Sequence, residues 1–66
     1  MRLAKLLILL RGDRTLRDME KVTGISNAFW SQLERGKVKS PSIDTIKRLC
    51  AVFPHQKQNI LEAVGL

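Results

Sequence analysis

The sequence predicts an all-α fold of five short helices in one compact domain, and three observations carry that prediction. The chain has 66 residues, which is enough for one small hydrophobic core. Strand-type alternation of apolar and polar residues is absent, and β-branched residues do not cluster. Apolar residues recur instead at the spacing of amphipathic helices. We therefore expect residues 1–66 to form a single helical domain, and dimerisation would raise its marginal stability.

The first helix is expected over residues 2–11, with one apolar face made of the leucines at positions 3, 6, 7 and 10. Ile8 and Leu9 widen that face, so we expect this helix to be contacted on two sides. The start MRLAKLLILLR resembles a signal peptide, but its apolar run is too short, and Arg11 ends it without a small-residue cleavage site. The run is also too short to cross a membrane. We therefore expect a buried helix, no membrane association and a cytoplasmic protein.

Two short helices with a tight turn between them are predicted from Thr15 to Gly36. Thr15 is a suitable N-cap for a helix over 16–23, and Gly24 can adopt the left-handed backbone that ends it. Ser26 can cap a second helix over 27–35. A connection of about three residues is typical of a helix-turn-helix unit. Apolar residues stand where two crossed helices need them: Leu16, Met19, Ile25, Trp30 and Leu33.

Two further helices are predicted after the basic loop KVKSP. The first begins near Ser42, carries Asp44 in its first turn, where negative charge suits the helix dipole, and ends before Pro54. Its expected apolar stripe consists of Ile43, Ile46, Leu49, Cys50 and Phe53. The last helix is expected over 56–64.

These runs resemble the lambda-repressor/Cro-type helix-turn-helix family. LRDMEKVTGIS resembles the first half of the motif, TGISNAFWSQLERGK the recognition half, and SPSIDTIKRLCAVF the helix that follows. The resemblance covers roughly residues 3–53. It implies a lambda-repressor-like domain that binds double-stranded DNA sequence-specifically as a transcriptional regulator, with repression as the expected output. The net charge of +6 suits an anionic partner, although many soluble domains are basic without binding nucleic acid.

In such a motif the second helix lies in the major groove, and its N-terminal residues contact base edges. Asn and Gln pair with adenine through two hydrogen bonds, and an alanine methyl can pack on a thymine methyl. We therefore expect base contacts from the first turns of this helix: Asn27, Ala28, Ser31 and Gln32. The alternative for Asn27 and Gln32 is that they cap the helix or contact phosphate.

Phosphate contacts are expected from polar and basic residues around that helix: Ser26, Arg17, Arg35, Lys37, Lys39 and Ser40. Such contacts provide affinity and salt dependence rather than sequence choice. The alternative for each basic residue is a solvated surface side chain. Phe29 either contacts DNA or packs on a neighbouring helix, whereas Trp30 is expected in the core.

Two positions depart from the residue types of the family, and a third, Glu34, lacks the family's usual arginine partner. Leu16 stands where the family often has a Gln that braces a phosphate and the recognition helix. Glu20 stands where a small Ala usually packs at the helix crossing, so its carboxylate must reach solvent or a cation, or the crossing must open. Glu34 is typical of the family and is often paired with an arginine of the first helix. Here Arg11 or Arg14 is expected to take that part.

A single short recognition helix reads only a few base pairs, so useful specificity favours a homodimer on a two-fold operator. Candidate dimer contacts are Ile60, Leu61, Val64 and Leu66. The alternative is that these residues close the monomer core. A second function class is an antitoxin-like or protein-interaction module of the same fold, whose main partner is a regulatory protein.

Catalysis, cofactors and metal binding have no support in the sequence. His55 stands alone beside Pro54, with no nucleophile and orienting group evident around it. Cys50 and His55 together fall short of the four ligands of a structural zinc site. Cys50, the single cysteine, cannot form an internal disulfide and is expected in the core. We therefore expect a binding protein rather than an enzyme.

Overall fold

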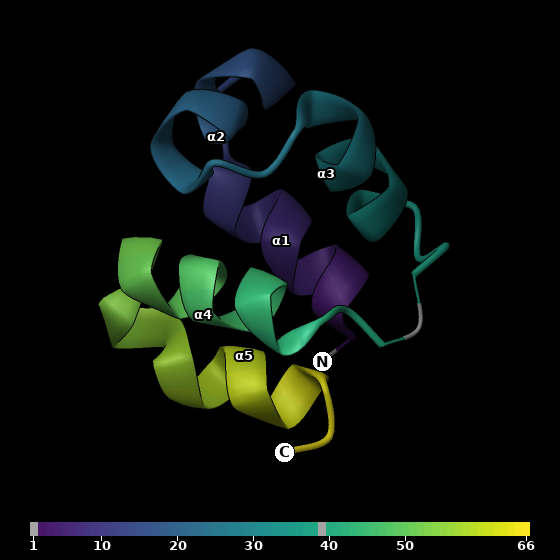
Figure 1. Ribbon diagram of the computed structural model, residues 1–66, viewed down its shortest axis with the longest axis vertical. Helices are drawn as coiled ribbons and strands as arrows, with labels where there is room; N and C mark the ends of the chain where they lie inside the picture. The colour runs from purple at the N-terminus through teal and green to yellow at the C-terminus, as the bar shows by residue number, and fades with distance from the viewer. Residues whose placement is uncertain (1, 39) are drawn as a thin grey trace.

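The structure, a computed structural model, describes residues 2–38 and 40–66, and its regular elements there are helices (Figure 1). They are α1 (Leu3–Arg11), α2 (Leu16–Thr23), α3 (Asn27–Glu34), α4 (Ile43–Val52), a 3₁₀ turn η1 (Pro54–Gln56) and α5 (Lys57–Ala63). The predicted all-α, five-helix architecture is confirmed, and the α2 bounds agree with the prediction. The predicted end of α1 and start of α3 also agree, and the remaining predicted ends differ from the observed ones by about one residue.

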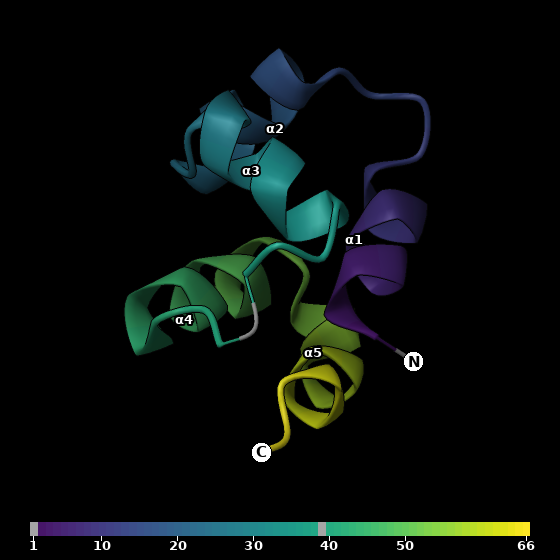
Figure 2. The same cartoon turned by 90° about the vertical axis from the view of Figure 1, so that its right-hand side faces the viewer.

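Helix α1 connects the two halves of the fold. It packs against α3 on one side and α5 on the other, while α2 packs on both α3 and α4. In Figures 1 and 2, α2 and α3 lie together at one end of the molecule, and α4 and α5 lie at the opposite end. The helix-turn-helix pair is therefore held on α1 and α4, and α5 lies away from it.

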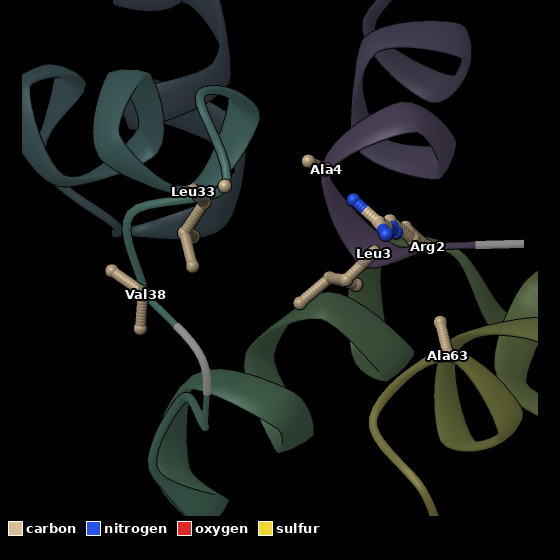
Figure 3. Close-up of a pocket in the computed structure, with 7 residues that line it drawn as sticks. Arg2, Leu3, Ala4, Leu33, Val38 and Ala63 are labelled. Atoms are coloured by element: carbon tan, nitrogen blue, oxygen red, sulfur yellow. The ribbon is translucent and has the colours of Figure 1, made fainter.

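A pocket of about 200 Å³ opens where the start of α1, the chain after α3 and α5 meet (Figure 3). Its lining consists of Arg2, Leu3, Ala4, Leu33, Gly36, Val38 and Ala63. Most of these side chains are small or aliphatic, and none of them is a predicted base-contact residue.

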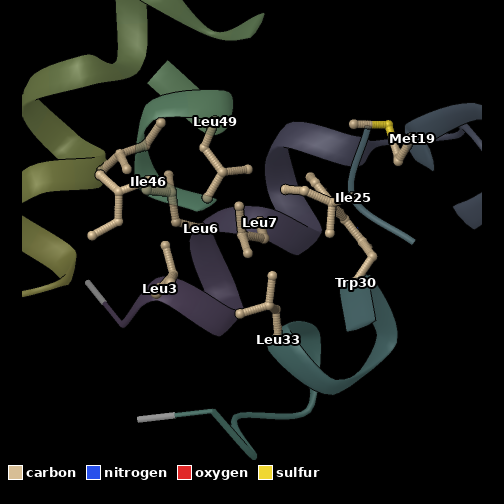
Figure 4. Close-up of a cluster of buried hydrophobic side chains, with 10 residues drawn as sticks. Leu3, Leu6, Leu7, Met19, Ile25, Trp30, Leu33, Ile46 and Leu49 are labelled. Atoms are coloured by element: carbon tan, nitrogen blue, oxygen red, sulfur yellow. The ribbon is translucent and has the colours of Figure 1, made fainter. Parts of the chain in front are cut away.

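The hydrophobic core is formed by residues from all five helices and from the α2–α3 turn (Figure 4). Its members are Leu3, Leu6, Leu7, Met19, Ile25, Trp30, Leu33, Ile46, Leu49 and Ile60. Trp30, Leu7 and Leu49 are fully buried. Truncating a buried tryptophan to alanine costs about 3–5 kcal/mol, a large part of the stability of so small a domain. The prediction that Trp30 is a core residue is confirmed.

Three apolar residues that the sequence places on buried faces are exposed. Ile8 is 47% exposed and Leu9 is 61% exposed, so the expectation that these two residues widen the buried face of α1 is wrong, although α3 and α5 do contact this helix on two sides. Both residues lie more than about 100° round the helix from the centre of the buried face that Leu3, Leu6 and Leu7 form. Ile43 is 68% exposed, because it lies about 120° round α4 from the fully buried Leu49. Cys50 is half-buried.

No helix among the described residues is long and apolar enough to cross a membrane.

Candidate nucleic-acid interface

Helix α2 begins at a capping box formed by Thr15 and Asp18. The Asp18 backbone N–H donates to Thr15 Oγ1 at 3.1 Å, and the Thr15 backbone N–H donates to Asp18 Oδ2 at 3.1 Å. Both bonds satisfy amides that lack helical partners. The hydrogen bonds from the backbone and side chain of Thr15 also lower the pKa of the Asp18 carboxyl. The predicted Thr15 cap is confirmed, and Arg17 is exposed on the same turn of α2.

The turn between α2 and α3 is held by the hydroxyl of Thr23. Thr23 Oγ1 donates to the Met19 carbonyl at 2.6 Å and accepts from the Ile25 N–H at 3.1 Å. Thr23 and Ile25 are each 5% exposed, so both bonds are shielded from water. Gly24 lies between them with φ of 75°, the left-handed conformation predicted to end α2. The role of Thr23 went unpredicted, although a threonine directly before a helix-ending glycine could have indicated it.

Helix α4 also reaches this turn, through Arg48. Its Nε donates to Asp44 Oδ2 at 2.9 Å, and its guanidinium lies over Gly24, where a Cβ atom would otherwise stand. A larger residue at Gly24 would therefore displace Arg48 in addition to straining the backbone.

Two side chains cap the start of α3. Ser26 Oγ accepts from the Phe29 N–H at 3.2 Å, as predicted for its capping part. Glu20 Oε1 accepts from the Asn27 backbone N–H at 3.2 Å and from Asn27 Nδ2 at 2.9 Å. The Glu20 carboxylate therefore finds its partner on α3, rather than a cation. The sequence shows that the Glu20 carboxylate needs a partner, but it does not identify Asn27 as that partner.

The two faces of α3 differ in burial. Trp30 and Leu33 are 0% and 2% exposed and anchor the helix in the core. On the other side, Asn27, Ala28 and Gln32 are exposed and Ser31 is half-buried. Residues four apart share a helix face, so 27 lies beside 31 and 28 beside 32. We call these four residues the outer face of α3.

Phe29 lies at the edge of the outer face. Its side chain is half-buried and packs against the core cluster. Of the two alternatives open for Phe29, the structure therefore shows packing within the domain, with part of the ring left accessible.

Helix α3 ends in a Schellman motif. The Gly36 N–H donates to the Leu33 carbonyl at 3.2 Å, and the Lys37 N–H donates to the Gln32 carbonyl at 3.0 Å. Gly36 has φ of 72°, which permits this reversal. The motif fixes the chain direction after α3, and the exposed Lys37 follows directly in the chain.

Three further predicted phosphate contacts lie at the two ends of α3 and in the loop before α4. Ser26, Arg35 and Ser40 are exposed, like Arg17 and Lys37. Lys39, the other predicted contact, lies outside the described residues.

The end of α3 is joined to the end of α1 through Glu34, which pairs with Arg11, one of the two arginines expected for this role. The Trp30 indole N–H also donates to Glu34. Burial raises the pKa of the Glu34 carboxyl, but hydrogen bonds from Arg11 and Trp30 and the charge of Arg11 outweigh burial, so that pKa lies below its ordinary value. Glu34 is therefore ionised at neutral pH.

The four predicted dimer residues divide by burial. Ile60 is fully buried and closes the core, so for this residue the alternative holds: no surface remains for a second copy. Leu61 and Val64 are half-buried and pack against the core. Leu66 is 74% exposed, and its N–H donates to the Leu61 carbonyl at 2.8 Å.

Among residues 2–38 and 40–66, no three His, Cys, Asp or Glu residues lie close enough to hold a metal ion.

The fold and the exposed outer face of α3 define a small helix-turn-helix DNA-binding domain. A family model described as the Cro/C1-type HTH DNA-binding domain matches residues 2–64. The chain therefore belongs to this family, as its motifs predict, and is a DNA-binding transcription regulator. No curated protein and no solved structure matches the chain significantly.

Proposed function

We propose that this chain is a sequence-specific repressor that works in the cytoplasm and inserts α3 into the major groove of double-stranded operator DNA. The observation that carries the proposal is the two-sided character of α3. Trp30 and Leu33 lock one side into the core, and the outer face presents polar side chains to solvent. A largely solvent-exposed polar face, on the recognition element of a DNA-binding family, is the expected place for base contacts.

The size of α3 suits this task. Its eight residues span about 12 Å, and an α-helix with its side chains is about 10–12 Å in diameter, close to the width of the major groove of B-DNA. Within that length, Asn27 and Gln32 each offer one acceptor and one donor group, the pattern that adenine requires. Ala28 and Ser31 fill the surface between them. One copy of α3 therefore reads only a few base pairs.

Cationic and hydroxyl groups around the outer face would bind phosphates and set the position of α3. The exposed Arg17 lies at the start of α2, and Arg35 and Lys37 follow α3. Ser26 and Ser40 add hydroxyl groups. Lys39 is included among the proposed phosphate contacts because of its place in the sequence. The net charge of +6 raises the rate of encounter with DNA.

We further propose that two copies bind a two-fold operator. Half-sites of such operators lie about 34–36 Å apart, one helical turn of DNA. The chain measures 28 × 24 × 21 Å, so two touching copies can place their α3 helices at that separation. Leu66, with the accessible parts of Leu61 and Val64, provides the contact surface.

A second candidate function rests on α1. Ile8 and Leu9 expose adjacent aliphatic side chains on the outward side of this helix. An exposed apolar pair on a small domain suits a protein partner. On this reading the chain is an antitoxin-like or protein-interaction module, and DNA binding is secondary.

Fluorescence anisotropy tests the first proposal. The wild-type chain is titrated against a duplex from the region upstream of its own gene and against a scrambled duplex, at two salt concentrations. We expect tighter binding to the native duplex that persists at the higher salt, because base contacts add to the salt-sensitive phosphate contacts. Equal binding to both duplexes, lost steeply with salt, would favour the protein-interaction module.

A double substitution then tests the outer face. Asn27→Ala with Gln32→Ala should reduce the preference for the native duplex by roughly 30-fold or more, since each two-bond base contact is worth about 1–3 kcal/mol. The matched control is Gln58→Ala with Asn59→Ala, which removes the same two residue types from exposed positions on α5. A native preference unchanged by the Asn27 and Gln32 substitutions would exclude the proposed reading of DNA.

A further inference from the structure

The carboxylate of Glu20 binds the first residue of the recognition helix at two points. One oxygen, Oε1, accepts both the backbone N–H and the side-chain Nδ2 of Asn27, at 3.2 and 2.9 Å. Glu20 lies on α2 and is half-buried, whereas Asn27 is exposed on the outer face of α3. A side chain of the first helix therefore holds the side chain proposed to read a base.

The chemistry of this contact allows only one orientation of the Asn27 amide. An ionised carboxylate accepts hydrogen bonds and cannot donate them. Rotating the amide by 180° would turn Oδ1 toward Glu20 and set two acceptor oxygens against each other. The Asn27 backbone N–H, which shares the same Glu20 oxygen, holds the carboxylate in place. Asn27 therefore keeps Nδ2 toward α2.

The groups that remain free on Asn27 match one base edge. One hydrogen of Nδ2 is used by Glu20, which leaves the second hydrogen and both lone pairs of Oδ1. A donor beside an acceptor in a set order is the complement of adenine, which offers N7 as acceptor and N6–H as donor in the major groove. An unrestrained Asn can present the two groups in either order.

We infer that Glu20 is a specificity-determining positioning residue, which makes Asn27 select adenine by holding its amide in one orientation before DNA is bound. This inference rests on the proposed function. Glu20 itself need not touch DNA. It acts by removing the rotational freedom that Asn27 would otherwise lose on binding.

The test uses duplexes that differ from the preferred one at single base pairs. Comparing wild type with Asn27→Ala identifies the base pair whose preference depends on Asn27. At that pair, Glu20→Ala should lower the preference for adenine by about three- to tenfold, the size expected when a previously ordered side chain must be immobilised on binding. Preferences at other base pairs should be unchanged. Glu20→Gln keeps an acceptor for both donors and should fall between wild type and Glu20→Ala.

Two comparisons separate positioning from a general effect. Glu62→Ala removes the same charge from an exposed position on α5, at the opposite end of the molecule from α3 (Figure 1), and should leave every base preference intact. Combining Glu20→Ala with Asn27→Ala should give the base preferences of Asn27→Ala alone. If Glu20→Ala weakens all duplexes by one common factor, or lowers the adenine preference equally with and without Asn27, the inference is overturned.

Failure of the proposed function would look different. A wild-type chain with no preferred duplex would refute the DNA-reading proposal itself. A wild-type chain that discriminates, but whose preferences do not depend on Asn27, would overturn only the inference about Glu20. If Glu20→Ala does not fold, as judged by circular dichroism, Glu20→Gln provides the test. A Glu20→Gln variant with the wild-type preference at the base pair that depends on Asn27 would count against the inference.

Discussion

The guanidinium of Arg11 and the carboxylate of Glu34 form a two-point ion pair, with Nε to Oε2 at 2.7 Å and Nη2 to Oε1 at 3.0 Å. The pair joins the last residue of α1 to the last residue of α3. Arg11 Nη1 also donates to the Arg14 carbonyl at 2.8 Å, in the loop that leads to α2. One arginine therefore links α1, the recognition helix and the start of the helix-turn-helix.

Replacing Glu34 by Gln should lower the free energy of unfolding by about 1–3 kcal/mol, because hydrogen bonds to charged groups are worth about that much. The Glu34 side chain is only 10% exposed, so water has little access to the groups that the lost carboxylate leaves without a charged partner. Urea denaturation measures the change. Glu62→Gln is the control, since Glu62 is exposed and should change stability by less than about 0.5 kcal/mol. Equal stability of the two variants would show that the ion pair is not stabilising.

Acid should destabilise the domain through Glu34 and Asp18. The folded-state pKa of each carboxyl is below its ordinary value of 4.5 and 3.8, respectively. The unfolded chain therefore binds protons more readily, and stability falls as pH drops. The contribution is complete above the ordinary values and is lost as pH falls through the lower folded values. We expect a constant urea midpoint from neutral pH to about pH 5 and a decrease below it. Glu34→Gln should show a shallower decrease, and a parallel one would assign the acid sensitivity elsewhere.

Gly24→Ala should destabilise the α2–α3 turn by about 1–2 kcal/mol, the cost of placing a side chain in left-handed backbone. Displacement of Arg48 should add to that cost. Gly65→Ala is the matched control, because Gly65 also has positive φ, at 82°, but has open space where its Cβ would stand. Thermal melts of both variants, each repeated with Arg48→Ala, measure the difference. If the effect of Gly24→Ala is the same with and without Arg48, the crowding contributes nothing.

Thr23→Val should cost about 1–3 kcal/mol, although valine has nearly the same shape as threonine. The substitution removes the acceptor for the buried Ile25 N–H, and a buried donor without a partner loses its full desolvation energy. Thr23→Ser keeps the hydroxyl and should retain most of the stability. Urea denaturation compares the two variants. A serine variant as unstable as the valine variant would show that the methyl group of Thr23, rather than its hydroxyl, matters.

Lys37→Ala should weaken binding to all duplexes alike and reduce the slope of log K against log salt by about 0.9, as expected for one lost phosphate contact. Lys57→Ala removes another exposed lysine, at the start of α5, and should leave the slope unchanged. Anisotropy titrations at several salt concentrations measure both slopes. Identical slopes for the two variants would place Lys37 away from the phosphate backbone.

Local chemistry in the sequence was sufficient to place the helices. Thr15, Ser26 and Ser42 cap α2, α3 and α4 by accepting a backbone N–H three residues ahead. Gly24 ends α2 in left-handed backbone. These interactions involve residues close together in the chain, so they can be predicted without knowing where any helix packs. Membership of the DNA-binding family followed from the same short motifs.

Only the tertiary structure decided which apolar side chains are buried and which side chains on different helices contact each other. Ile8 and Leu9 are as apolar as the buried leucines of α1 but are exposed, because α3 and α5 approach the other side of that helix. Ile60 is buried because α5 folds back onto α1 and α4. Glu20 binds Asn27 because the α2–α3 turn brings together residues that the sequence spacing does not pair. Periodicity determines which residues of a helix share a face, but only the packed arrangement determines what each face meets.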